Sequence, residues 1–252
     1  MIGFLTGGDP SLELSRRYLK AVVEGGVDIL EIGVPFSDPV ADGVTIQAST
    51  YRALTAGVTL SDILRLAEDI KRSTDIPIVL LSYMNPIHRF GVKRFLQAAR
   101  SSGVDGLVIP DLPVEEADEL LETARTVQID TVFLASPTTS EKRLERILRA
   151  STGFVYLVSL LGVTGVRREI SPEALRLLER VKSRGREPYA AVGFGVSEPA
   201  HVALLAERGA DGVIVGSSLV RIVEENLDSP ERTAQLLRSF TRSLREATGR
   251  RG

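Results

Sequence analysis

The chain of 252 residues contains no cysteine. Disulfide bonds, thiolate metal sites and cysteine nucleophiles are therefore excluded. No apolar run approaches the roughly 18 residues that a membrane-spanning helix needs, and the N-terminus lacks a basic stretch followed by an apolar signal core. These absences predict a cytoplasmic protein without a membrane segment.

Histidine and lysine are both scarce. The two histidines, His88 and His201, are expected on the surface, which argues against a histidine-dependent triad or metal site. The lysines are Lys20, Lys71, Lys93, Lys142 and Lys182, and none ends a predicted strand. A Schiff-base aldolase mechanism is therefore disfavoured.

Charge of one sign is not in excess. The formal net charge is −2, which argues against a nucleic-acid or anionic-membrane partner held by bulk electrostatics. A charged fraction of 25% and an apolar fraction of 43% are typical of a globular protein.

Short apolar segments alternate with amphipathic segments along the whole chain. Eight predicted strands cover residues 2–6, 28–33, 76–83, 106–109, 131–134, 154–158, 189–192 and 211–215. Strands that alternate with helices predict a parallel sheet covered by helices, either closed or open and doubly wound. Eight units in about 250 residues favour a closed (β/α)8 barrel with extra helices. We expect one domain over residues 1–252.

Local signals place several helix starts and turns. Asp9 before Pro10, Thr138 of a capping box with Glu141, and Ser197 are predicted helix caps. The segments 25–33, 102–109 and 208–216 share one design, in which a glycine ends a helix and an aspartate precedes an apolar strand.

Glu31 interrupts an apolar strand, and a carboxylate is costly to bury without a partner. One explanation is that it faces solvent on a half-exposed strand, and another is that it pairs with a structural partner. If Leu30 and Ile32 pack on the helices, strand alternation instead points Glu31 into the barrel, near its mouth. A carboxyl among apolar neighbours there should have a raised pKa suited to proton transfer.

Glycines cluster after the last three predicted strands, at residues 162–165, 193–195 and 216. Glycine lets backbone N–H groups approach an anion, and the next helix adds a favourable dipole. Loops after strands seven and eight are the usual phosphate site of the barrel. We therefore expect a phosphate-containing ligand.

Other candidate groups are less decisive. Glu31, Asp38 and Asp42 form a possible Mg²⁺ site, which we rank below acid–base chemistry because the phosphate site looks backbone-made. Tyr83 and Tyr156 end strands, and spacing alone leaves pocket wall and core equally open.

The segments 4–10, 30–47, 83–86, 110–116, 159–165, 192–197 and 216–217 together resemble one family, the α subunit of tryptophan synthase. The block from Leu30 to Gly43 is the most specific of them, and the resemblance spans nearly the whole chain. It implies a TIM barrel that cleaves indole-3-glycerol phosphate to indole and glyceraldehyde 3-phosphate by a retro-aldol reaction. It also implies an α2β2 complex with a β subunit, which alone would carry pyridoxal phosphate. No cofactor or metal is implied for this chain.

The resemblance also assigns roles to residues. Glu31 matches the general acid/base, and Asp42 matches the second acid, which accepts the indole N–H. Asp38 and Pro39 match a loop that closes the site and touches the β subunit. The substrate-contacting positions are Phe4, Leu81, Tyr83, Tyr156, Thr164, Phe194 and Ile214, and the phosphate positions are Gly165, Gly195, Gly216 and Ser217.

Three features depart from the family pattern. The chain begins almost at its first strand, so we expect the family's preceding helix to be missing. Val44 stands where proline is usual, which is expected to loosen the loop of Asp42, and Gly7-Gly8 replaces Ala-Gly. None removes a catalytic group. Two alternatives therefore stay open beside the complexed lyase: a stand-alone lyase that releases indole, and a non-catalytic phosphate-binding or activator subunit.

Overall fold

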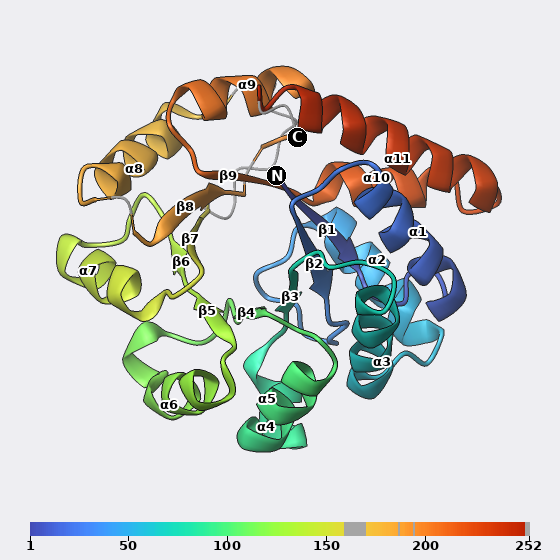
Figure 1. Ribbon diagram of the computed structural model, residues 1–252, viewed down its shortest axis with the longest axis horizontal. Coiled ribbons are helices and arrows are strands. Elements are labelled where there is room, and N and C mark those ends of the chain that lie inside the picture. The colour runs from blue at the N-terminus through green and yellow to red at the C-terminus, as the bar shows by residue number, and fades with distance from the viewer. Residues whose placement is uncertain (159–169, 186, 194, 250–252) are drawn as a thin grey trace.

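The parallel sheet closes into a barrel. The computed structural model describes residues 1–158, 170–185, 187–193 and 195–249. Within them, nine parallel strands follow the order β5-β4-β3-β2-β1-β9-β8-β7-β6. They are β1 (Ile2–Thr6), β2 (Ile29–Gly33), β3 (Ile78–Leu81), β4 (Gly106–Val108), β5 (Asp130–Val132), β6 (Leu134–Ala135), β7 (Phe154–Leu157), β8 (Tyr189–Val192) and β9 (Gly212–Val215). Figure 1 shows the strands as a central ring, which confirms the predicted TIM barrel.

The ring closes at one interrupted strand. The predicted strand 131–134 is divided at Phe133 into β5 and β6. β5 pairs with β4, whereas β6 pairs with β7. The carbonyl of Phe133 accepts the N–H of Tyr156 at 2.9 Å. Because β5 and β6 are successive pieces of one segment, the two ends of the sheet meet there.

Helices surround the ring (Figure 1). They are α1 (Leu12–Glu24), α2 (Val44–Thr55), α3 (Leu60–Lys71), α4 (Met84–Phe90), α5 (Val92–Ser101), α6 (Asp118–Val127), α7 (Glu141–Ala150), α8 (Pro172–Lys182), α9 (Pro199–Glu207), α10 (Ser217–Glu224) and α11 (Pro230–Glu246), with a 3₁₀ helix at Val114–Glu116. Two helices follow each of β2, β3 and β9. The sequence did not predict α4 or α10.

All three predicted helix caps are wrong, beginning with those of α1 and α7. The N-cap of α1 is Ser11, whose Oγ accepts the N–H of Leu14, whereas Asp9 is bound to a distant side chain. The N-cap of α7 is Ser140 rather than Thr138. Asp9 is bound instead by Arg52, far along the chain, whereas Thr138 hydrogen-bonds to its neighbour Ser136.

His201 is buried, contrary to prediction, with 5% of its surface exposed. Its Nδ1 accepts the backbone N–H of Ser197 at 3.3 Å, and its Nε2 lies 3.3 Å from Glu198. Glu198, not Ser197, is the N-cap residue of α9. The imidazole thus ties the start of its own helix to the loop that follows β8.

The repeated glycine–aspartate turns form as predicted. Gly26, Gly103 and Gly209 have positive φ angles of 98°, 79° and 84°. The Asp105 carboxylate then accepts the N–H of Ile78 at 2.9 Å and the Nζ of Lys71 at 2.8 Å. Asp28 binds the amino group of Met1, and Asp211 binds Ala190 N–H and Lys182. Each aspartate therefore fixes the start of the strand that precedes its own in the chain and pairs with it.

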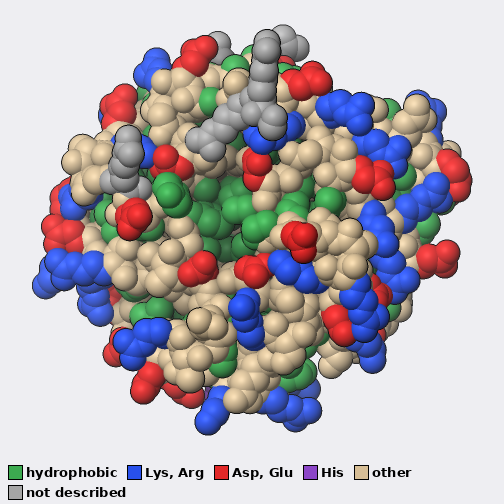
Figure 2. All heavy atoms as spheres, viewed as in Figure 1, with side chains coloured by type: hydrophobic (Ala, Val, Ile, Leu, Met, Phe, Trp, Pro, Cys, Tyr) green, Lys and Arg blue, Asp and Glu red, His purple; other side chains and the backbone are tan. Residues whose placement is uncertain are grey.

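The face seen in Figure 2 has an apolar hollow at its centre with acidic side chains around it. A cavity of about 590 Å³ lies at the amino ends of the strands, between Ile2, Ile29, Val79 and Phe154 among others. Its lining includes the aspartates Asp28, Asp105, Asp130 and Asp211. The strands' carboxyl ends, where barrel enzymes keep their chemistry, lie at the opposite end.

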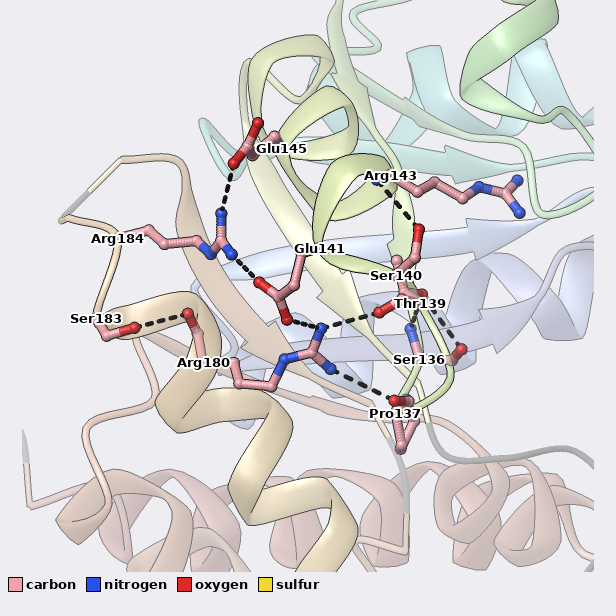
Figure 3. A network of polar contacts seen from close by, with 10 residues as sticks. All are labelled: Ser136, Pro137, Thr139, Ser140, Glu141, Arg143, Glu145, Arg180, Ser183 and Arg184. Carbon is pink, nitrogen blue, oxygen red and sulfur yellow. Dashed lines mark hydrogen bonds and ion pairs between the residues drawn. The ribbon is translucent and has the colours of Figure 1, made fainter.

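An ion-pair network joins α7 and α8 (Figure 3). Arg180 donates to Glu141 at 2.6 Å and to the carbonyl of Thr139 at 2.9 Å. Arg184 also contacts Glu141 and lies 3.4 Å from Glu145. These charges connect the C-terminal half of α8 to the start of α7.

Among the described helices, none combines the length and the apolar character needed to cross a membrane.

Candidate active site

Glu31 lies inside the barrel, as strand alternation predicts. Leu30 and Ile32 belong to the main core between strands and helices, whereas Ile29 packs against the cluster inside the barrel. Glu31 shares the parity of Ile29 and is fully buried. Its register partners are Phe4 on β1 and Val79 on β3. The solvent-facing explanation is therefore wrong.

The Glu31 carboxyl is buried without a hydrogen-bond partner for either oxygen among the described residues. Burial in this apolar environment and, to a smaller extent, the nearby charge of Asp42 together raise the pKa of Glu31 to about 8. At neutral pH this carboxyl is predominantly protonated, which removes most of the penalty of burying it.

Asp42 lies in the loop between β2 and α2, directly before the helix begins at Val44. The Tyr83 hydroxyl accepts the N–H of Ala41 at 3.1 Å and hydrogen-bonds to the Asp42 carboxylate. Gln47 donates to the carbonyl of Asp42 at 2.7 Å. Burial raises the pKa of Asp42 to about 6, against the lowering effect of the Tyr83 hydrogen bond.

The two acids therefore differ in protonation near pH 7. Glu31, with a pKa of about 8, holds its proton, whereas Asp42, with a pKa of about 6, is ionised. Environments that push the pKa values of two neighbouring acids apart assign one as proton donor and the other as anion. The pair is suited to giving a proton at one point of a ligand and stabilising positive charge at another.

A cavity of about 220 Å³ opens above Glu31, at the carboxyl ends of the strands. Its apolar walls include Phe4, Leu81, Tyr156 and Ile214, and Asp42 lies at its edge. Glu31 is not in its lining but one layer below, where it interacts electrostatically with both Asp42 and Tyr156. Tyr156 is thus pocket wall rather than plain core.

One end of the cavity is built from the start of α10. Gly216, the N-cap residue, and Ser217, the first helical residue, both line it. The Ser218 hydroxyl donates to the Val196 carbonyl at 3.0 Å and so ties this helix start to the loop after β8. Helix N-termini favour anions, so a phosphate group fits here.

The remaining predicted residues are placed less directly. Gly195 has a φ of 67° and is exposed, outside the cavity lining. Tyr83 supports the Asp42 loop instead of lining the cavity. Thr164, Gly165 and Phe194 lie outside the described residues.

Asp38 and Pro39 belong to the loop that carries Asp42. The N–H of Asp42 donates to the Pro39 carbonyl at 3.0 Å. This turn fixes the position of Asp42 relative to Asp38 and Pro39. Val40, the next residue, is 75% exposed although it is apolar.

The sequence missed Gly193 as a wall residue. A Cβ atom at this position would lie 2.2 Å from Cε1 of Tyr156, so only glycine lets the Tyr156 ring occupy its place. The Gly-x-Gly pattern suggested a phosphate loop or a simple turn, and neither points to a contact with Tyr156. Pairing of Tyr156 with Ala191, two residues before Gly193, is a tertiary contact that spacing does not reveal.

Among the described residues, no group of three or more His, Asp or Glu side chains lies close enough to hold a metal ion. The fold and the two acids at the mouth of the barrel define the class: a (β/α)8-barrel enzyme of the acid–base type.

Comparison with known proteins specifies the family. The family model for the tryptophan synthase alpha chain matches residues 1–249. The tryptophan synthase alpha chain of Methanoregula boonei is 49% identical over 98% of this chain and 92% of its own length. That of Pyrococcus abyssi is 47% identical over 97% of this chain and 96% of its own length.

Solved structures agree. The tryptophan synthase A-subunit of Pyrococcus furiosus is 46% identical, with a TM-score of 0.90 over 98% of this chain and 97% of that one. A structure of the tryptophan synthase α2β2 complex from the same organism gives a TM-score of 0.92 at 46% identity, with the same coverage. The chain belongs to the tryptophan synthase alpha chain family.

The pKa of Glu31 predicts how stability depends on pH. The unfolded chain loses this proton near pH 4.3, whereas the folded chain keeps it up to about pH 8. The stabilisation is fully present below the unfolded pKa and is lost as pH rises through the folded pKa. Relative to Glu31→Gln, the free energy of unfolding should fall by about 1.4 kcal/mol per pH unit across this interval.

Urea unfolding of both proteins at several pH values measures this difference. The Gln variant is the matched control because its amide keeps the shape and does not titrate. Parallel pH profiles for the two proteins would show that Glu31 is ionised in the folded chain.

Proposed function

We propose that this chain cleaves indole-3-glycerol phosphate to indole and glyceraldehyde 3-phosphate, as the α subunit of a tryptophan synthase complex. The observation that carries the proposal is the fully buried, unpaired carboxyl of Glu31 beneath a small apolar cavity. Membership of the tryptophan synthase alpha chain family supports the choice of reaction.

The substrate's chemistry matches the two ends of the cavity. The apolar side chains of Phe4, Leu81, Tyr156 and Ile214 suit a planar indole ring and the adjoining glycerol carbons. Gly216 and Ser217 offer backbone N–H groups to the phosphate at the start of α10. Gly195, with Gly165 from the segment outside the described residues, completes the proposed phosphate site. Tyr83, Thr164 and Phe194 complete the proposed substrate contacts.

In the proposed reaction the Glu31 carboxyl first donates a proton and then accepts one. Glu31 turns up into the cavity and gives its proton to the ring carbon that carries the side chain. Its carboxylate then takes the proton from the neighbouring glycerol hydroxyl. The carbon–carbon bond breaks, the hydroxyl carbon becomes the aldehyde, and the bonding electrons restore the aromatic indole. Glu31 thus ends the cycle protonated, as it began.

Asp42 stabilises the charge in between. Protonation of the ring carbon leaves positive charge on the indole, centred on its nitrogen. The Asp42 carboxylate, ionised at pH 7 because its pKa is about 6, accepts the indole N–H and lowers the energy of this cation. Tyr83 positions it by holding the loop at Ala41.

The proposal extends to partner, cofactor and location. Asp38 and Pro39, next to the exposed Val40, form the contact with the β subunit. This chain uses no cofactor of its own, and pyridoxal phosphate belongs to the β subunit. The chemistry takes place in the cytoplasm.

Glu31→Gln should abolish indole formation, because the amide neither gives nor takes the proton. A loss of roughly 10²–10⁴-fold or more in kcat is expected for a positioned proton-transfer group. Steady-state indole release measures it, and the affinity for glycerol 3-phosphate, which should remain within about twofold, shows that the site is still folded. Turnover at the parental rate would refute the assignment.

The β subunit should raise the rate of indole release, because contact at Asp38 and Pro39 orders the loop that carries Asp42. Stopped assays with and without a tryptophan synthase β subunit measure the effect. Asp38→Ala is expected to reduce the activation while leaving the rate without the β subunit within about threefold. An equal rate in both assays would favour the stand-alone lyase instead.

A further inference from the structure

Helices α2 and α10 both begin at the cavity. Gly43, the N-cap residue of α2, and Gly216, the N-cap residue of α10, line it together with Asp42 and Ser217. The two helices contact each other and β1. The direction of α2 therefore sets the place of Asp42, and the direction of α10 sets the proposed phosphate site.

Helix α2 has little apolar surface to hold it in place. Its buried side chains are the small residues Ser49, Thr50 and Ala53, and Ile46 is only partly buried against the core. Ser49 Oγ lies 2.6 Å from Thr6 Oγ1 at the end of β1. A helix with so small a buried face depends on polar contacts for its orientation, because area-based stabilisation is small.

Arg52, in the last turn of α2, makes two of these polar contacts with one carboxylate. Its Nε and Nη2 donate to the two carboxylate oxygens of Asp9 at 2.7 and 2.9 Å. The Asp9 side chain is only 4% exposed, and that of Arg52 is 18% exposed. Two parallel hydrogen bonds between buried charges give a fixed geometry as well as an attraction.

The same guanidinium also reaches α10. Its Nη1 lies 3.4 Å from Oε1 of Glu224, the last residue of that helix. Asp9 belongs to the loop after β1, so Arg52 joins three segments at one point. The far ends of the two helices that begin at the cavity are thereby held against β1.

We propose that Arg52, bound to Asp9 and Glu224, is a positioning residue that sets Asp42 and the start of α10 at the spacing that one substrate molecule requires. The inference rests on the function proposed above. Arg52 touches no substrate and acts only through the two helices.

Three variants and a control test it. Arg52→Gln removes the charge, and Arg52→Lys keeps the charge without the paired hydrogen bonds. Glu224→Gln removes the ion pair between α10 and Arg52 but leaves the pair between Arg52 and Asp9 intact. Lys71→Gln is the control, since Lys71 forms a comparable half-buried ion pair with Asp105 at the opposite end of the barrel. All four are compared well below their melting temperatures.

The expected results distinguish the contribution of α2 from that of α10. Arg52→Gln should lower kcat by roughly 10²-fold, as small misplacements of catalytic groups do, and Arg52→Lys by about tenfold. Glu224→Gln should weaken inhibition by inorganic phosphate and raise KM by about tenfold with kcat within about twofold. Lys71→Gln should lower the melting temperature with neither kinetic change.

Hydrogen exchange gives a readout that needs no turnover. The N–H of Gln47 donates to Gly43 and that of Val220 to Gly216, so these amides report on the first turns of the two helices. Both should exchange faster in Arg52→Gln, and only Val220 in Glu224→Gln.

Two results would overturn the proposal: parental kcat and KM in the Arg52 and Glu224 variants, or losses that merely follow the melting temperature as in Lys71→Gln. Glu31→Gln is assayed alongside. Retained turnover in that variant would refute the proposed chemistry. The hydrogen-exchange rates of Gln47 and Val220 would still test whether Arg52 positions the two helices.

Discussion

The burial of one unpaired carboxyl governs this molecule. Glu31 sits fully buried on β2 between Phe4 and Val79, and no described residue offers its oxygens a hydrogen bond. An ionised carboxylate there is costly without a hydrogen-bond partner, so the group keeps its proton at neutral pH. At neutral pH the folded barrel therefore holds Glu31 mainly in the form that can donate a proton. The desolvation that makes the ionised form unfavourable therefore also raises the pKa of Glu31, so that the carboxyl can act as an acid.

The surrounding architecture keeps Glu31 enclosed. Closure of the sheet at Phe133 removes the strand edges, and the aspartates at residues 28, 105 and 211 fix the starts of neighbouring strands. At the opposite end, the helices that follow β2 and β9 bring Asp42 and Ser217 to one cavity. The fold thus separates a structural end from a chemical end, with Glu31 between them.

Much of this follows from local sequence patterns. Strand alternation placed Glu31 inside the barrel, and the glycine–aspartate turns formed with positive φ as their spacing indicates. The cap at Asp9 was wrong because Arg52, far along the chain, binds that side chain, whereas Thr138 hydrogen-bonds locally to Ser136 and Ser140 caps the helix. The burial of His201 and the support of Asp42 by Tyr83 also depend on tertiary contacts that no local pattern contains. The family resemblance supplied the roles of the site residues, which geometry alone leaves open.

The most direct test is a carboxyl-carbon NMR titration of the free protein, with Glu31→Gln and Asp42→Asn spectra to assign the two signals. The account predicts that Glu31 titrates near pH 8 and Asp42 near pH 6. A Glu31 signal that titrates near pH 4.3, the ordinary value for glutamate, would contradict it.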